Sequence, residues 1–240
     1  MTANVEWLLI AVIVALYLKD SMLLLDPDEA ILIRRGGGRW DAGFGMRRFR
    51  LSGREPWLAN PFMPHRPVMR LRWAMRGEAV AREDATDMPR LPMALAALVW
   101  WNWTLLLLVI PMLLIGYRDV GLIVFAVIAL YLGIGMSLLL VWQQRSALSI
   151  SARAFGVLSF ECLACAPVAI NLIRKVSLAR SVDEDFLHAM ERLLDDRRQR
   201  AARANLVARL DDQLEIEADD EGLAQAMRRL RARLAEPVVE

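Results

Sequence analysis

The sequence LAALVWWNWTLLLLVIPMLLIG occupies residues 95–116, and VGLIVFAVIALYLGIGMSLLLVW follows it at residues 120–142. Neither segment contains a charged residue. About 20 apolar residues in a helix are enough to cross the hydrocarbon core of a bilayer. Only Tyr117, Arg118 and Asp119 separate the two segments. We therefore expect a transmembrane helical hairpin over residues 95–142.

A third apolar run, WLLIAVIVALYLKDSMLLL, covers residues 7–25. No Lys or Arg precedes this run and no small-residue cleavage site follows it, so residues 1–25 predict a retained transmembrane helix rather than a cleaved signal peptide. Lys19 and Asp20 lie near its end, where the long Lys19 side chain can reach the headgroups. The alternative is a polar contact inside a helix bundle, in which Asp20 meets Asn102 or an arginine.

The distribution of arginine orients the three predicted helices. Between Ala30 and Arg76 there are eleven arginines and only two acidic residues. Loops rich in Lys and Arg stay on the cytoplasmic side of a membrane. We therefore expect a multi-pass protein of a bacterial-type cytoplasmic (inner) membrane, with the N-terminus outside and the C-terminus in the cytoplasm.

The predicted fold class is a mainly α integral membrane protein with three transmembrane helices, a small cytoplasmic β-containing insertion and a helical cytoplasmic tail. The insertion covers residues 26–94. Alternating apolar residues predict short strands near Glu29–Arg35 and Met46–Leu51, with a glycine turn at Gly36–Gly38. Prolines spaced by three in Asn60–Pro67 indicate a stiff connector. So few strands need a covering surface, which is the membrane, the tail or another subunit.

Residues 143–176 contain a fourth apolar stretch, Ala154–Ile173, that is long enough to cross a membrane. It also contains Glu161, Pro167 and Asn171, and a spanning helix would place the basic residues that follow it outside. The sequence therefore favours interfacial, re-entrant or protein-buried helices that are broken at Pro167. If the stretch did span, the tail would lie outside the cytoplasm.

The tail, residues 177–240, is highly charged and carries leucines at helical spacing. Ser181 and Glu184 match a capping box that begins a helix. The apolar stripes predict amphipathic helices that pack within the chain or on a partner. A net charge of +2 and the lack of a recognised binding fold argue against nucleic acid as a partner.

Few residues indicate chemistry. Cys162 and Cys165 are three residues apart, and with His65 and His188 they are the only candidates for a zinc site. A structural zinc site usually has a second closely spaced ligand pair, so we expect no metal or cofactor and interpret the cysteines as buried apolar side chains. A carboxylate such as Glu161 can relay protons at membrane depth, but acid–base catalysis needs a positioned partner that the sequence does not indicate.

Basic and aromatic residues close to a membrane favour contact with anionic lipid headgroups or with a protein partner. The candidate contacts are Arg34, Arg35, Arg39, Arg47, Arg48, Arg50, Arg70, Arg72 and Trp73. The sequence therefore predicts a non-enzymatic membrane scaffold or accessory subunit that binds a protein partner, a second copy of itself or lipid. One alternative is an oligomeric transporter or channel with Lys19, Asp20, Asn102 and Glu161 along a polar path. A second is a membrane metal or redox protein that uses Cys162 and Cys165.

Overall fold

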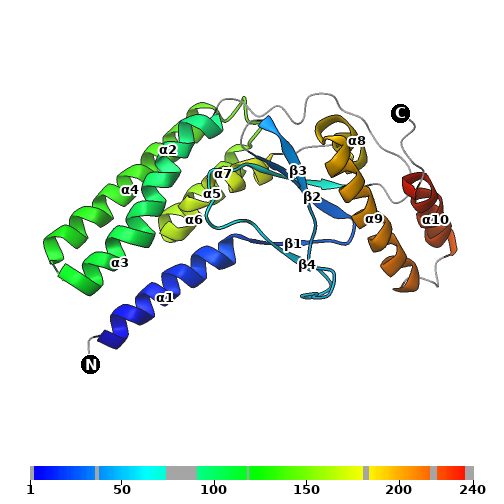
Figure 1. Cartoon of the computed structure of the whole chain (residues 1–240). Helices are drawn as coiled ribbons and strands as arrows, with labels where there is room; N and C mark the ends of the chain where they lie inside the picture. The colour runs from blue at the N-terminus through cyan, green and yellow to red at the C-terminus, as the bar shows by residue number, and fades with distance from the viewer. Residues whose placement is uncertain are drawn as a thin grey trace. The chain divides into compact units, whose positions relative to one another are not determined.

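The computed structural model describes residues 3–35, 38–73, 91–117, 119–180, 184–216 and 221–235. The chain is mostly helical and has a small β region (Figure 1). Its contacts divide it into two compact units. Unit 1 comprises residues 1–23, 58–67 and 87–181, and unit 2 comprises residues 24–57, 68–86 and 182–240. The residues of the predicted insertion are thus divided between the two units.

Helix α1 (Ala3–Asp20) begins unit 1 and is shorter than the apolar run that predicts it. The prediction of one helix over the whole of residues 7–25 is wrong at its end. The amide of Ser21 still bonds to the Tyr17 carbonyl, and residues Met22–Leu25 then form strand β1, which pairs with β4 (Glu55–Leu58). The side chains of Asp20 and Ser21 make polar contacts where the helix ends.

Two helical segments of unit 1 are long and apolar enough to cross a membrane, Pro92–Gly116 and Val120–Gln143. The first consists of α2 (Leu91–Thr104), the π-helical segment η2 (Leu105–Val109), α3 (Ile110–Met112) and the π-helical segment η3 (Leu113–Tyr117). Pro111 lacks an amide hydrogen and cannot make the regular helical bond, which explains wider turns on either side of it.

The second segment is the helix α4 (Val120–Gln143). The Asp119 side chain caps its first turn by accepting hydrogen bonds from the amides of Gly121 and Leu122, at 2.8 and 3.2 Å. Arg118, the middle residue of the predicted turn, lies outside the described residues. Helices α2 and α4 pack closely at Gly133, where a Cβ atom would lie only 2.5 Å from the Asn102 Oδ1. The two apolar segments therefore pack against each other as a helical hairpin.

The stretch 154–173 is three helices rather than one. They are α5 (Ala152–Ala164), α6 (Ala166–Ile170) and α7 (Leu172–Ala179). The break falls at Cys165, and Pro167 takes the first turn of α6, where a missing amide costs no helical bond. At about 1.5 Å per residue, none of the three is long enough to cross a bilayer alone.

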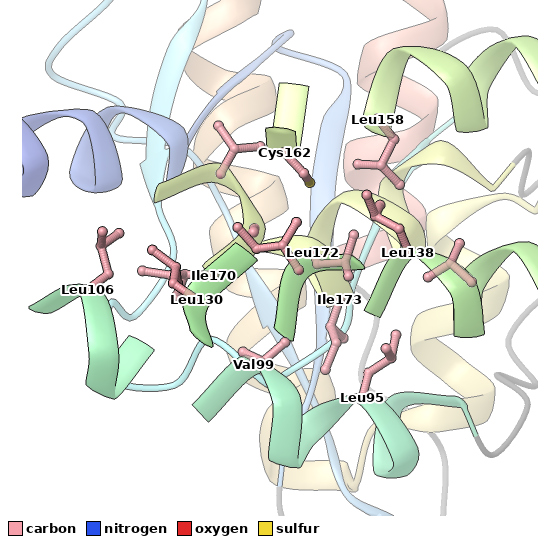
Figure 2. Close-up of a cluster of buried hydrophobic side chains, with 14 of the residues drawn as sticks. Leu95, Val99, Leu106, Leu130, Leu138, Leu158, Cys162, Ile170, Leu172 and Ile173 are labelled. Carbon is pink, nitrogen blue, oxygen red and sulfur yellow. The ribbon is translucent and has the colours of Figure 1, made fainter. Parts of the chain in front are cut away.

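The core of unit 1 lies between these helices (Figure 2). Leu95 and Val99 of α2 pack with Leu172 and Ile173 of α7 in one buried cluster. Cys162 of α5 is completely buried in the same cluster.

Unit 2 contains an antiparallel three-stranded sheet in the order β3-β2-β5. Its strands are β2 (Glu29–Arg34), β3 (Trp40–Gly43) and β5 (Val68–Arg72). The predicted strand at Glu29–Arg35 is therefore confirmed as β2. The predicted strand at Met46–Leu51 is wrong, because Leu51 only bridges to Arg54 around a tight turn. In the predicted glycine turn, Gly38 has a φ of +77° and residues 36 and 37 lie outside the described residues.

The sheet is covered by tail helices α8 (Phe186–Leu193), α9 (Asp196–Ile216) and α10 (Glu221–Ala235). Alternate residues of β2 and β5, such as Leu32 and Met69, share a core with Phe186 and Leu206 of these helices. Of the three coverings that the sequence allows for the short strands, the tail is the one found. Ser181 of the predicted capping box lies outside the described residues, and Asp185 caps α8 by accepting a bond from the Leu187 amide at 2.7 Å.

Candidate functional site

Polar side chains gather in unit 1 where α1 ends, although apolar packing surrounds them. Six residues form this group, which we call the α1-end cluster: Asp20, Ser21, Glu161, Asn171, Arg174 and Lys175. They come from the end of α1, from α5, from Asn171 between α6 and α7, and from α7. The end of α1 therefore meets a segment about 150 residues later in the chain in one hydrogen-bonded group.

Lys175 lies between two carboxylates. Its Nζ is 2.9 Å from Asp20 Oδ1 and 2.8 Å from Glu161 Oε2. With both carboxylates within hydrogen-bond distance, Lys175 is placed to bind them as an ammonium ion.

Asn171 and Arg174 extend the cluster to the segment that precedes β5. The Asn171 Nδ2 donates to Asp20 Oδ2 at 3.0 Å, and its Oδ1 accepts from Arg174 Nη1 at 2.7 Å. The other Arg174 amino group donates to the carbonyls of Asn60 and Met63. A buried guanidinium needs several acceptors, and carbonyls of the proline-rich segment supply them here.

The charges of the α1-end cluster balance, with two carboxylates against Lys175 and Arg174. Such an arrangement holds the end of α1 against α6 and α7. Both carboxylates accept from the Lys175 ammonium, so neither is presented as an unpaired general base. The cluster is therefore suited to fixing helices together more than to proton transfer.

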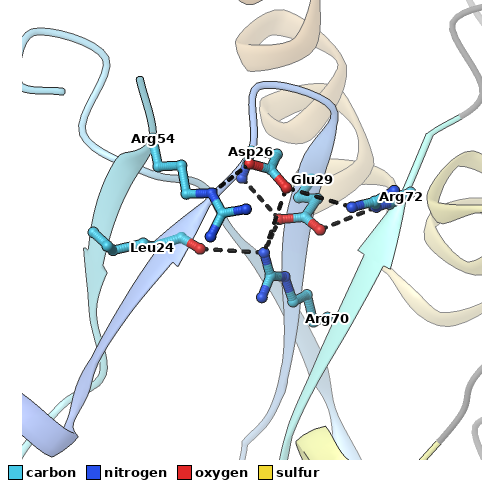
Figure 3. A network of polar contacts seen from close by, with 6 residues as sticks. All are labelled: Leu24, Asp26, Glu29, Arg54, Arg70 and Arg72. Atoms are coloured by element: carbon cyan, nitrogen blue, oxygen red, sulfur yellow. Dashed lines mark hydrogen bonds and ion pairs between the residues drawn. The ribbon is translucent and has the colours of Figure 1, made fainter. Parts of the chain in front are cut away.

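A second polar network lies in unit 2 (Figure 3). Glu29 is buried in β2, and it accepts hydrogen bonds from Arg70, from Arg72 and from the Asp26 amide. Arg54 donates to Asp26 Oδ1 at 2.8 Å. Burial by itself raises the pKa of Glu29, but these hydrogen bonds outweigh burial and hold the pKa below its ordinary value. The network ties the start of β2 to the end of β5.

A buried ion pair also joins α9 to the segment around β4. Arg209 of α9 donates to Glu55 and to the Gly45 carbonyl, and its guanidinium lies 5.2 Å from the centre of the Phe44 ring. The side chains of Arg209 and Glu55 are only 4% and 3% exposed. Nearby, Arg47 makes an exposed pair with Asp212 at 2.6 Å. Residues of the insertion and of the tail are thus held together by charge as well as by the apolar core.

Most of the residues that the sequence predicts as lipid or partner contacts instead contact other residues of the chain. Trp73 is 1% exposed and belongs to the core of unit 2, so its prediction as a surface contact is wrong. Other candidates bind within the chain: Arg35 with Asp41, Arg47 with Asp212, Arg50 near Glu55, Arg70 and Arg72 with Glu29, and Arg34 over the Trp40 ring. Arg39 and Arg48 are exposed.

The structure does not bring the four metal candidates together. Among the described residues there is no group of three or more His, Cys, Asp or Glu side chains that could hold a metal ion. Cys162 is completely buried, Cys165 is half-buried, and neither is in a disulfide. His65 packs against the Trp100 ring in unit 1, whereas His188 belongs to α8 of unit 2.

The polar residues proposed for a transport path lie in different surroundings. Lys19 is exposed, and Asp20 binds Lys175 and Asn171 rather than Asn102. Asn102 is completely buried beside Gly133, and its amide atoms have no hydrogen-bond partner among the described residues. The alternative contact between Asp20 and Asn102 is therefore not found.

Sequence reasoning identified Asp20 and Glu161 but missed their partner Lys175. A usable signal existed, because Lys19 and Lys175 are the only lysines in the chain. It also missed Arg209 and Glu55, whose pairing joins positions more than 150 residues apart. Comparisons with family models, curated proteins and solved structures find no match to this chain. The functional proposal therefore rests on the two units described above.

Proposed function

We propose that this chain is a non-enzymatic scaffold or accessory subunit of a bacterial-type inner membrane. Three helices hold it in the bilayer with the N-terminus outside. Unit 2 then lies in the cytoplasm, where it presents a surface to a protein partner or to anionic lipid.

The exposed apolar surface of α4 is the observation that carries this proposal. Phe125 is 69% exposed and Leu132 is 64% exposed, and neighbouring valines and isoleucines are exposed as well. Soluble monomers rarely expose a continuous apolar surface along a whole helix, because water makes such a surface unfavourable. Acyl chains of a bilayer are the solvent that suits it.

The shape of α1 supports a third membrane helix. Its 18 residues correspond to about 27 Å, close to the thickness of a hydrocarbon core. Trp7, Leu8 and other large apolar side chains are exposed along it. Within unit 1, the start of α1 and the η3 end of the helical hairpin lie toward the same side, at the left of Figure 1. This direction agrees with an outside N-terminus.

Unit 2 offers one surface that combines apolar and basic residues, which we call the 46–51 tip. Met46 and Phe49 are exposed there, and the exposed Arg48 lies between them in sequence. The following turn is formed by Ser52 and Gly53, both with positive φ. Large exposed apolar side chains beside arginine are typical of a contact surface for a protein or a lipid headgroup.

A comparison of variants in the full-length protein tests the proposal. The double variant Arg48→Glu, Phe49→Ser changes the tip, and Arg39→Glu changes an exposed arginine elsewhere in unit 2. Each protein is extracted with its native lipids, and co-purifying proteins and phospholipids are measured by quantitative mass spectrometry. We expect a stoichiometric protein or an enrichment of anionic phospholipid that the tip variant loses and the Arg39→Glu control keeps.

Two results would contradict the proposal. Extraction of the chain from membranes by alkaline carbonate would remove its membrane basis. A monomer that retains neither a stoichiometric partner nor anionic lipid would remove the scaffold role. The transport and metal alternatives gain no support from the described contacts, in which Asp20 is ion-paired and the candidate metal ligands do not converge.

A further inference from the structure

Residues 152–179 lie against the hairpin in a way that sets their depth in the membrane. The ring of Phe155, near the start of α5, is 5.0 Å from the ring of Trp142 at the end of α4. Eight residues later, the Leu163 carbonyl accepts a hydrogen bond from the Tyr131 hydroxyl at 3.3 Å. Helix α5 therefore runs antiparallel to α4, from its C-terminal end toward its middle.

The position of Tyr131 along α4 indicates the depth in the bilayer at which α5 ends. Tyr131 is the twelfth of the 24 residues of α4 and lies 11 residues before Trp142. At about 1.5 Å per residue, that separation is roughly 16 Å along the helix axis. If α4 crosses the bilayer, the end of α5 lies close to the level of the midplane, because a hydrocarbon core is about 30 Å thick.

The chain then returns to the side from which it entered. After the break at Cys165, α6 and α7 lead back, and Ile173 of α7 packs in the same cluster as Leu95 near the start of α2 (Figure 2). The start of α2 and the end of α4 form the same end of the hairpin. Both ends of this segment are therefore on one side, with the turn at Cys165 between them.

The backbone at the turn is suited to membrane depth. The Cys165 amide donates to the Glu161 carbonyl, the Val168 amide donates to the Cys165 carbonyl, and the Asn171 amide donates to the Val168 carbonyl, all at 2.9–3.0 Å. Residues 167–171 are buried among the helices of unit 1. Residues 165 and 166 at the turn itself are half-buried. Backbone inside a membrane needs its polar groups satisfied within the protein, and these three hydrogen bonds satisfy part of the backbone at the turn.

The outer face of α5 is apolar. Val157, Phe160 and Leu163 are 54%, 73% and 49% exposed, and their spacing of three places them on one side of the helix. An interfacial helix would instead present a strongly charged face to water. Helix α5 has only Arg153 and Glu161 as charged residues, and Glu161 is bound to Lys175.

We propose that α5 and the α6–α7 return form a re-entrant helical hairpin that dips from the cytoplasmic side to about the middle of the bilayer. The face formed by Val157, Phe160 and Leu163 contacts the acyl chains of the cytoplasmic leaflet. This inference rests on the proposed membrane insertion of α4. It further implies that the segment 154–173 does not cross the membrane, so the tail stays in the cytoplasm.

Single-cysteine labelling of the full chain tests this topology. Cys162→Ala, Cys165→Ala provides the background, into which Ala152→Cys, Phe160→Cys or Leu163→Cys is introduced. A membrane-impermeant maleimide is applied to right-side-out and inside-out vesicles. We expect labelling at position 152 from the cytoplasmic side only, and loss of labelling at positions 160 and 163 from both sides until detergent is added.

Two further positions separate the possible failures. Ala235→Cys in the tail should be labelled from the same side as Ala152→Cys, and opposite sides would show a spanning segment and overturn the inference. Equal labelling of positions 152, 160 and 163 would also overturn it. Phe125→Cys on α4 should be protected. If position 125 were labelled freely, the proposed membrane insertion would fail as well, which distinguishes the two errors.

A second measurement uses the unmodified chain in case a cysteine variant does not fold. Phospholipids with a diazirine near the middle of the acyl chain are activated in bilayers that contain the wild-type protein, and adducts are mapped by mass spectrometry. We expect adducts on residues 157–163 from the mid-chain probe and none from a headgroup probe. The opposite pattern would place α5 at the surface.

Discussion

Loss of the Arg209 side chain should destabilise unit 2 strongly. In Arg209→Leu, the Glu55 carboxylate loses its buried partner, the Gly45 carbonyl loses a donor and the Phe44 ring loses the guanidinium that faces it. Removal of one member of a buried ion pair costs about 3–5 kcal/mol. Arg50 lies 3.7 Å from Glu55 and can partly replace the lost charge. We therefore expect the free energy of unfolding of unit 2 to fall by about 3 kcal/mol, the lower end of that range.

A double variant separates the ion pair from the packing. Replacement of a buried ion pair by apolar residues of similar size is often nearly neutral. In Arg209→Leu, Glu55→Leu no buried charge remains, so most of the lost stability should return. Arg47→Leu is the matched control, because its pair with Asp212 is exposed and should contribute less than about 1 kcal/mol.

Hydrogen exchange of the full chain in lipid nanodiscs measures these effects. Mass spectrometry of peptides from β2 and α9 gives the free energy of opening of unit 2. The reasoning is refuted if Arg209→Leu lowers that free energy by less than Arg47→Leu does. It is equally refuted if the double variant is as unstable as the single one.

Three other changes have defined outcomes. Because the folded-state pKa of Glu29 is lowered, its contribution to stability is complete above its unfolded-state pKa and is lost as the pH falls through the lower folded value. Acid titration of unfolding should therefore show a pH-dependent loss that Glu29→Gln lacks. Gly133→Leu should weaken packing of the hairpin, since a Cβ there meets an amide oxygen at 2.5 Å, whereas Gly135→Leu points into open space and should leave the thermal unfolding temperature unchanged. Lys175→Met should destabilise unit 1 by about 1–3 kcal/mol in thermal or denaturant unfolding, because Glu161 loses its ammonium partner and Asp20 keeps only the Asn171 amide. Lys19→Met at an exposed position should have little effect.

Local sequence patterns predicted those helices and strands whose composition or alternation can be recognised within one continuous segment. The uncharged runs at residues 95–116 and 120–142 predicted the two long helices, and Glu29–Arg35 predicted β2. The strand predicted at Met46–Leu51 failed because alternation over six residues cannot indicate whether a neighbouring strand exists. The run at residues 7–25 was assigned too long a helix, since apolar composition alone does not distinguish the end of a helix from a short strand.

The sequence indicated only some of the residues of the α1-end cluster. Asp20 and Glu161 stood out as charges within apolar runs, and such charges need partners. Their partner Lys175 comes from a different helix, and no spacing rule relates positions that meet only after three helices have packed. Trp73 shows the reverse error, because an aromatic residue among arginines resembles a membrane contact until the tail helices bury it.

The sequence by itself determined which segments are helical and apolar, because a run of uncharged residues has few other stable solutions once water is excluded. The arginines of the insertion are the sequence feature on which the proposed orientation rests. Only the tertiary structure decided that the insertion and the tail share one core and that α1, α5 and α7 meet at one ion-paired cluster. Those results depend on contacts between residues far apart in the chain, and the free energy of such contacts is set by burial and geometry, which no local pattern records.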